Sequence, residues 1–418
     1  MTTGADAVHG FDADVAVVGL GAIGSSAAWR LASRGLDVIG IEQHEPGHPW
    51  GGSHGRTRLF RVACLEHPGL TPIARRAREL WRELEAASGR ELLLETGGIM
   101  IGRPGSRIID GTLAASREHV LPVEQLDPAE IARRLPGHAR LDPGDVGLWD
   151  PEAGILHPEA AIVAAVDAAR AAGARIRTGE RVLAVEPDPE GARSAAAGAD
   201  SAVVAAGVAG GTADAAEPGV TIRLASGDLR VRRVVVTAGP WLPQLVPGLP
   251  IAPHRVVMTW FRARDGHDAS VDRMPVFIRS VPGTDRWIWG HGALPGDLAK
   301  VGQEFDGSFE SDDPDAIDRE IHPGETADIS GLVAATFPDL EPEPADATTC
   351  IMAHTPDGQF VVGRPDERAD ASGRVVVAGG CSGHSFKHAA ALGELAAQLT
   401  VDEAPFTDIG FLDPRRFA

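Results

Sequence analysis

Two lysines are the most informative basic residues of this sequence. The 418-residue chain has 39 basic residues, of which only Lys300 and Lys387 are lysine, and tyrosine and asparagine are absent, so codon usage is strongly biased. Arginine replaces a surface lysine at little cost, but it cannot replace a compact ammonium that acts as a point charge in a tight pocket. The composition therefore predicts functional positions for both lysines, with chance survival as the alternative.

A glycine-rich turn, Gly19-Leu-Gly21-Ala-Ile-Gly24, follows the first expected strand and leads into a helical pattern; a second strand over 37–41 ends in Glu42. This is the dinucleotide-binding pattern in its required context. The glycines make the turn, admit a pyrophosphate to the backbone at the positive end of the helix, and let helix pack on strand. Glu42 is placed to accept hydrogen bonds from an adenosine ribose. The pattern predicts NAD or FAD without deciding between them.

A second glycine-rich turn lies near the C-terminus. It spans Gly379 to Lys387, follows an apolar run over 375–378, and precedes a helical pattern that includes Leu392 and Leu395. Such a turn is unusual in a nicotinamide dehydrogenase but suits a flavoprotein, where the start of a late helix can lie under the flavin pyrimidine and favour its anionic reduced form. The turn therefore favours FAD, and it carries one of the two lysines.

Hydrophobic periodicity places the remaining expected elements. Helices are expected over 71–88 and 158–173, and strands over 175–177, 182–185 and 231–237. The segment 187–218, rich in Ala, Gly and Asp, is expected to be a partly disordered surface insertion.

Composition excludes several classes of protein. The net charge of −20 argues against a nucleic-acid partner or an anionic membrane surface. No window reaches the ~20 apolar residues of a membrane span, and residues 1–9 lack the features of a secretory signal. Cys64, Cys350 and Cys381 are too few for a disulfide framework, so a reducing cytoplasm is expected. His384 and His388 lack a third ligand, so no metal site is expected.

Taken together, the motifs resemble those of the monomeric sarcosine oxidase and N-methyltryptophan oxidase group, within the D-amino-acid-oxidase-like flavoproteins. The resemblance runs nearly end to end, apart from the Ala-rich insertion. The motifs that carry it are Gly19-x-Gly21-x-x-Gly24 with Glu42, Gly52-Ser-His-Gly-Arg-Thr-Arg58-x-x-Arg61, Thr237-Ala-Gly-Pro-Trp241, Cys350-Ile-Met-Ala-His-Thr-Pro-Asp357 and Gly379-Gly-Cys-Ser-Gly-His-Ser-Phe-Lys387.

The resemblance implies an α/β fold in two interleaved domains. A Rossmann-like FAD-binding domain of the glutathione-reductase-2 type is expected over 10–92, 152–247 and 347–418. An α+β substrate domain built on a large mixed sheet is expected over 93–151 and 248–346, where it covers the flavin.

The resemblance also implies roles for individual residues. Cys350 matches the cysteine joined through sulfur to the flavin, and Arg61 and Lys387 match the pair that grips the substrate carboxylate. Lys300 matches the lysine associated with oxygen activation. His54 and Arg58 match basic residues on the flavin's other side, and these three are the expected catalytic residues. The expected cofactor-binding residues are Gly19, Gly21, Ile23, Gly24, Glu42, Gln43, Ser53, Thr57, Arg58, Val182, Gly239, Trp241, Cys350, Gly380, Gly383, His384 and Lys387.

Three expected substrate-binding positions depart from the group's pattern. Trp289 and Met352 stand where the group has tyrosine, a residue that this chain lacks altogether. Glu304 stands where the group has histidine, and this chain keeps 15 histidines elsewhere. We therefore expect a bulkier or cyclic secondary amino acid, with Glu304 favouring a protonated amine or accepting its proton. The alternative is that Glu304 pairs with an arginine at the pocket edge.

The resulting prediction is an FAD-dependent oxidase of secondary or N-methylated amino acids. It would oxidise the C–N bond to an imine and reduce O2 to H2O2, with a small amino acid and O2 as its partners and a monomeric chain. Two alternatives remain: a flavin dehydrogenase that passes electrons to a carrier, or a proline- or pipecolate-type oxidase. A non-catalytic cofactor-binding protein is disfavoured because both lysines and Arg61 are retained.

Overall fold

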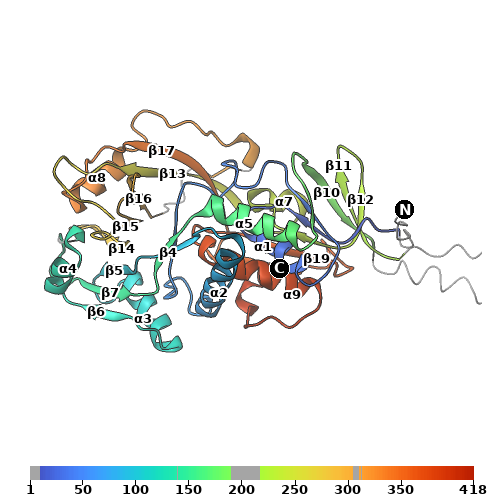
Figure 1. Cartoon of the computed structure of the whole chain (residues 1–418), viewed down its shortest axis with the longest axis horizontal. Helices are drawn as coiled ribbons and strands as arrows, with labels where there is room; N and C mark the ends of the chain where they lie inside the picture. The colour runs from blue at the N-terminus through green and yellow to red at the C-terminus, as the bar shows by residue number, and fades with distance from the viewer. Residues whose placement is uncertain (1–9, 139, 190–216, 305–309, 312) are drawn as a thin grey trace, which may run out of the picture.

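The computed structural model describes the whole chain except residues 1–9, 139, 190–216, 305–309 and 312. Most of the segment 187–218, expected to be a surface insertion, lies outside the described residues. The described chain forms two large sheets and one small sheet (Figure 1).

The first large sheet holds the N-terminal glycine turn. Its strand order is β10-β11-β12-β1-β2-β9, with β19 pairing with β12 and β18 with β19. The central strands pair in parallel and are buried on both faces, which explains their continuous runs of valine and isoleucine. The strands are β1 Ala13–Val18, β2 Val38–Ile41, β9 Arg175–Arg177, β10 Val182–Pro187, β11 Val220–Leu224, β12 Leu229–Val236, β18 Val361–Gly363 and β19 Val375–Gly379.

A layer of helices packs beside this sheet (Figure 1). Helix α1 packs between α9 and α5, and α2 packs on α9. The helix expected over 71–88 is α2, and its apolar positions Ile73, Ala77, Leu80 and Leu84 are all buried as the periodicity predicts. The four helices are α1 Ala22–Ala32, α2 Leu70–Ser88, α5 Pro158–Ala171 and α9 Ala389–Thr400, and a short helix α7 spans Leu242–Leu245.

The second large sheet has the order β17-β13-β16-β15-β14-β5-β7-β6. It is mixed, because β14 pairs with β5 in parallel while its other pairings are antiparallel. Its strands are β5 Gly98–Gly102, β6 Glu124–Leu126, β7 Val146–Asp150, β13 Ala252–Phe261, β14 Val276–Ser280, β15 Trp287–His291, β16 Ala299–Gln303 and β17 Asp346–His354, and the nearby helices are α3 Arg107–His119, α4 Pro128–Arg134 and α8 Ala327–Thr336.

The small sheet has the order β3-β8-β4, with β3 Arg58–Phe60, β4 Leu93–Glu95 and β8 Gly154–Leu156. The expected α/β fold with a large mixed second sheet is confirmed. All strands of the first sheet fall within the segments expected to form the FAD-binding domain, whereas β17, expected in the same domain, pairs with β13 in the second sheet. No helix in the described part of the chain is long and apolar enough to cross a membrane.

Candidate functional site

A cavity of about 870 Å³ lies where the two large sheets meet. Its walls come from the carboxyl ends of β1, β2 and β19 in the first sheet and from β13, β15, β16 and β17 in the second. The volume is near the upper end of the ~300–1,000 Å³ range of small-molecule sites. The cavity therefore has room for a cofactor and a substrate together.

One end of the cavity is the N-terminal glycine turn. Gly19 has a positive φ of 85° and lies against the carbonyl of Thr237, and a Cβ on Gly24 would lie 1.8 Å from the Gly19 carbonyl oxygen. By contrast, a Cβ on Gly21 would meet only the Ser53 hydroxyl, at 3.8 Å. Gly19 and Gly24 are therefore required for close packing of the backbone. At Gly21 the backbone is exposed, so a pyrophosphate can approach it at the start of α1.

Glu42 ties the end of β2 to this turn. Its carboxylate accepts hydrogen bonds from the backbone N–H of Leu20 at 2.8 Å and of His44 at 3.0 Å, and the His48 ring lies 3.4 Å away. Burial raises the pKa of the Glu42 carboxyl, but His48 and these backbone donors outweigh burial and hold the pKa below its ordinary value. Glu42 therefore stays ionised and can accept hydroxyl hydrogens from a ribose.

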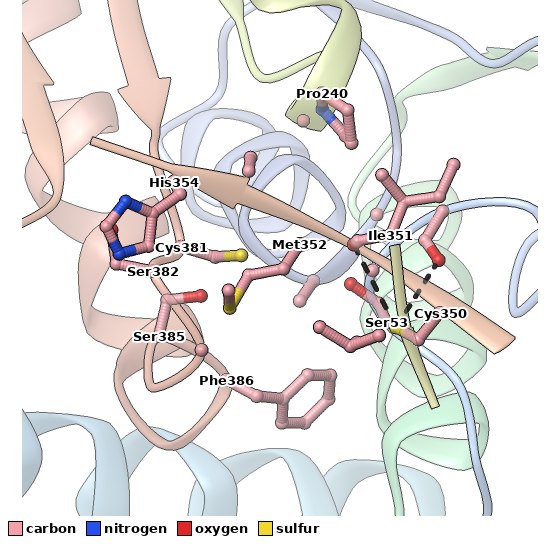
Figure 2. Close-up of a pocket in the computed structure, with 18 of the residues that line it drawn as sticks. Ser53, Pro240, Cys350, Ile351, Met352, His354, Cys381, Ser382, Ser385 and Phe386 are labelled. Carbon is pink, nitrogen blue, oxygen red and sulfur yellow. Dashed lines mark hydrogen bonds between the residues drawn. The ribbon is translucent and has the colours of Figure 1, made fainter. Parts of the chain in front are cut away.

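Cys350 faces the cavity from β17. Its sulfur lies 3.9 Å from the backbone oxygens of Gly51 and Ile351. Figure 2 shows Met352, on the same strand, pointing into the same pocket. Burial raises the pKa of the Cys350 thiol, and the guanidinium of Arg58, whose Nη2 lies 3.8 Å from the sulfur, opposes that rise. The thiol is thus on the cavity wall next to a fixed positive charge.

Arg61 and Lys387 meet on the cavity wall around a third charged residue, Glu66. Glu66 Oε1 accepts a hydrogen bond from Arg61 Nη2 at 2.6 Å and one from Lys387 Nζ at 3.2 Å. Lys387 Nζ also donates to the backbone carbonyl of His384, and Arg61 Nη1 to that of Ala63. These contacts fix two cations and one acid in a single cluster, which we call the Arg61–Glu66–Lys387 cluster.

The Glu66 carboxyl of this cluster stays ionised. Burial raises the pKa of the Glu66 carboxyl, but Arg61 and then Lys387 lower it well below its ordinary value. Burial lowers the pKa of Lys387, and Glu66 opposes this. Glu66 Oε2 and Arg61 Nε are buried and have no hydrogen-bond partner among the described residues, so donor and acceptor capacity remains for a ligand.

Lys300 lies behind the cavity wall rather than on it. Its side chain, on β16, is 1% exposed, and its Nζ donates to the backbone carbonyls of Gly55 and Thr57, both at 2.8 Å. The ammonium also lies over the ring of Trp260, 5.1 Å from its centroid. Burial, and then Arg58, lower the pKa of Lys300 well below its ordinary value. The charge of Lys300 can therefore influence a ligand in the cavity only through the backbone of the loop that contains Gly55 and Thr57.

The loop that separates Lys300 from the cavity is itself tied down. Glu159, in the first turn of α5, accepts hydrogen bonds from the backbone N–H of Gly55 at 2.7 Å and of Arg56 at 3.1 Å. His54, in the same loop, is buried, and burial and then Arg58 lower its pKa to about 4, so it is neutral at physiological pH.

Glu304 pairs with an arginine at the rim of the cavity. Arg286 Nε lies 3.2 Å from Glu304 Oε1, and the same guanidinium contacts Asp328. This is the alternative arrangement considered for Glu304. Trp289 and Met352 both line the cavity, and the Trp289 indole donates to the carbonyl of Gln303 at 2.9 Å.

A second, smaller chamber of about 240 Å³ adjoins the large cavity. Leu65, Ile278 and Trp287 form an apolar wall shared by both spaces, and Arg107 and Glu304 also border both. Leu65 precedes Glu66 in the chain, so one wall of the chamber lies near the Arg61–Glu66–Lys387 cluster.

The structure brings most of the expected site residues to one cavity. Four expected residues do not line it: Gly24, Thr57, His54 and Lys300. Sequence reasoning missed Glu66, which lies five residues beyond Arg61, the last residue of its motif. The signal that could have found it is that two buried cations require an acid as a partner. Cys381, given no role from sequence, also lines the cavity. The residues on the wall are Gly19, Gly21, Ile23, Glu42, Gln43, Ser53, Arg58, Arg61, Val182, Gly239, Trp241, Trp289, Glu304, Cys350, Met352, Gly380, Gly383, His384 and Lys387.

Comparisons with known proteins agree with this arrangement. The family model described as DAO, FAD dependent oxidoreductase, matches residues 14–399. The chain is 32% identical to a monomeric sarcosine oxidase of Streptomyces avermitilis, over 97% of this chain and 98% of that one. It is 28% identical to an N-methyl-L-tryptophan oxidase of Citrobacter koseri, over 97% and 99% of the two chains. The solved structure of NikD, an unusual amino acid oxidase essential for nikkomycin biosynthesis, superposes with a TM-score of 0.77 at 26% identity, over 96% of this chain and 97% of that one.

Proposed function

We propose that this chain, which belongs to the DAO family of FAD-dependent oxidoreductases, in the group of the monomeric sarcosine and N-methyl-L-tryptophan oxidases, oxidises the C–N bond of a secondary or N-methylated amino acid. The observation that carries the proposal is that Arg61 and Lys387 lie on the wall of the same cavity as the glycine turn. A carboxylate bound by these two cations would lie in a space shared with the cofactor.

Residues of this chain hold the two partners. The open backbone at Gly21, the ionised carboxylate of Glu42 and the turn from Gly379 to Lys387 fit FAD, which accepts a hydride equivalent from a carbon next to nitrogen. Arg61 supplies a planar fork of donors for a carboxylate, and Lys387 adds a compact charge. Together they orient the substrate, which is the usual use of such a clamp.

Cys350 is the proposed covalent attachment point for FAD, through its sulfur. The support is the position of the thiol on the cavity wall, with Arg58 3.8 Å away to stabilise the thiolate against burial. Replacing Cys350 with serine, which keeps the size of the side chain, tests the linkage: acid precipitation should then release the yellow cofactor into solution.

Lys300 is the proposed residue for reaction with O2, which would be reduced to H2O2 as the amino acid becomes an imine. A fixed, desolvated ammonium stabilises negative charge developing nearby without reorganisation. The hydrogen bonds to Gly55 and Thr57 hold this charge in place behind the loop that covers it. We further propose a monomeric enzyme of the cytoplasm, in keeping with the name of the sarcosine oxidase relative and with the three thiols.

The substrate is proposed to be bulkier than sarcosine. The chamber beside Glu66 offers an apolar wall of Leu65, Ile278 and Trp287 to a substrate side chain, and one relative is named for an aromatic N-methyl amino acid. Since Glu304 is already paired with Arg286, it is not proposed to bind the amine.

The test is an anaerobic screen of the holoenzyme with sarcosine, N-methyl-L-tryptophan, proline and pipecolate, followed by loss of the flavin absorbance. Bleaching by one of the larger substrates at the lowest concentration supports the proposal. Bleaching by sarcosine alone contradicts the bulky substrate, and bleaching by none of the four contradicts the reaction class.

A dehydrogenase that passes electrons to a carrier is the second candidate, and the position of Lys300 behind the cavity wall favours it. Oxygen uptake during turnover separates the two candidates. Stoichiometric H2O2 supports the oxidase, whereas turnover that needs an added electron acceptor supports the dehydrogenase.

A further inference from the structure

The Arg61–Glu66–Lys387 cluster contains an acid at the place where a substrate carboxylate is proposed to bind. Glu66 Oε1 bridges both cations, at 2.6 Å from Arg61 and 3.2 Å from Lys387. All three side chains are at most 9% exposed, and all three line the cavity. A buried charge is costly unless it is paired, so two cations without Glu66 would leave the empty site with two unpaired charges.

We infer that Glu66 sets the net charge of this cluster to +1, so that the site selects ligands with one carboxylate over ligands with two. The inference rests on the proposed function only for the place where the carboxylate binds. Arg61 and Lys387 contribute two positive charges and Glu66 one negative charge, so a single bound carboxylate brings the cluster to neutrality. A second carboxylate would leave one buried negative charge uncompensated.

The same count favours the form of an amino acid that can be oxidised. An amino acid with a neutral amine carries one negative charge and neutralises the cluster, whereas its zwitterion leaves the net charge at +1. The two cations therefore favour binding with the nitrogen lone pair free, and Glu66 reduces this preference relative to a cluster of charge +2.

Three other titratable groups around Lys387, the thiol of Cys64 and the rings of His384 and His388, do not alter this charge. Burial raises the pKa of the Cys64 thiol to about 12, so it is neutral. Burial lowers the pKa of His384 to about 4 and that of His388 well below its ordinary value, so both rings are neutral. Asp150, which interacts electrostatically with Arg61, lies off the cavity wall and accepts backbone N–H donors, including that of Ala63 at 3.4 Å.

The test compares two ligands of nearly equal size that the enzyme cannot oxidise, malonate and monomethyl malonate. Their dissociation constants are measured from changes in the flavin absorbance of the holoenzyme between pH 6 and 10. We expect wild type to bind the monoester at least tenfold more tightly than malonate at pH 7. In Glu66→Gln this preference should shrink at least tenfold, because the cluster then carries two positive charges.

The pH dependence separates a role in charge from a role in packing. Without Glu66, Lys387 loses the acid that raises its pKa, so binding of the monoester should be lost at a lower pH in Glu66→Gln than in wild type. Glu66→Asp, which keeps the charge, should keep the wild-type preference. Glu79→Gln, which removes an exposed acid paired with Arg76, should change nothing.

Equal weakening of both ligands in Glu66→Gln, with an unchanged pH profile, would assign Glu66 a structural role and overturn the inference. If Glu66→Gln does not retain cofactor, the wild type decides alone: tighter binding of malonate than of the monoester contradicts a cluster of charge +1. If the preference shifts as expected but no amino acid bleaches the flavin, the inference stands and the proposed reaction fails.

Discussion

The two lysines of this chain lie in opposite kinds of environment. Lys387 lies on the cavity wall with a carboxylate partner, Glu66, at 3.2 Å. Lys300 lies behind the wall, where two backbone carbonyls and the ring of Trp260 surround its ammonium. The scarcity of lysine in this sequence predicted a functional role for both residues, but only Lys387 lies where it can contact a ligand directly. Retention of a lysine therefore indicates a required ammonium without saying whether it binds or acts at a distance.

Among substitutions that distinguish Lys387 from Lys300, we expect the largest loss of activity at Lys387. Lys387→Met removes one partner of a buried charge pair and leaves Glu66 opposing the substrate carboxylate. We expect kcat/KM to fall about 1000-fold, in line with the ~2–5 kcal/mol that such truncations cost. Steady-state kinetics measure this, and the fall should appear mainly in KM. Lys387→Arg should recover part of the loss; a fall below tenfold in Lys387→Met would contradict direct binding.

Lys300→Met should produce the complementary result. We expect the reaction of the reduced enzyme with O2 to slow about 100-fold, the order of effect of removing one electrostatic stabiliser. The substrate dissociation constant should change less than about threefold, because Lys300 does not line the cavity. Stopped-flow measurement of the reductive and oxidative half-reactions gives both quantities. An unchanged rate of reaction with O2 would contradict the proposed role of Lys300. Lys387→Met is the control, because it should leave the rate of reaction with O2 unchanged.

The cofactor half of the site was more predictable from sequence than the substrate half. The glycine turn and Glu42 lie within one segment of 24 residues. The strand, turn and helix that position them follow one another along the chain, so spacing alone predicts their geometry. The Glu66–Lys387 pair joins residues 321 apart, and no local pattern reports it. The pairing of Glu304 with Arg286 likewise depends on the register of β15 against β16. Charge pairing across a cavity is a property of the assembled fold.

A pH titration should sharpen the difference between the lysines. Burial lowers the pKa of both ammonium groups. At Lys387 the next largest effect is Glu66, which opposes the shift, whereas at Lys300 it is Arg58, which adds to the shift, and Glu159 opposes it less. Each group acts only while protonated, so each function is lost as pH rises through the lowered pKa. We therefore expect the oxygen reaction to decline at least about one pH unit below the pH at which KM begins to rise. Half-reaction rates and KM between pH 6 and 10 measure this; the opposite order would contradict the assigned environments.

Trp260 offers a smaller test on the Lys300 side. Its ring lies under both Lys300, at 5.1 Å, and Arg56, at 4.6 Å. Trp260→Phe should lower the free energy of unfolding by about 1–2 kcal/mol through weaker cation–π contacts and slightly poorer packing, with a modest slowing of the oxygen reaction. Trp29→Phe is the matched control, since Trp29 lies beside Arg30 and far from either lysine in sequence. Denaturant unfolding should show similar losses in both, with the oxygen rate changed only in Trp260→Phe.

The smallest effect is expected at Glu304, where the group's histidine is replaced. Arg286 already neutralises this carboxylate at the rim, where both side chains are partly exposed, and exposed pairs contribute little, about 0–1 kcal/mol. Glu304→Gln should therefore change kcat/KM less than about threefold for every N-methyl amino acid. It should also leave the acid side of the pH profile unchanged. A fall of 30-fold or more, with loss of an acidic limb, would instead show that Glu304 takes the proton of the bound amine. In that case the selection of the neutral amine would belong to the rim of the cavity rather than to the charge of the Arg61–Glu66–Lys387 cluster.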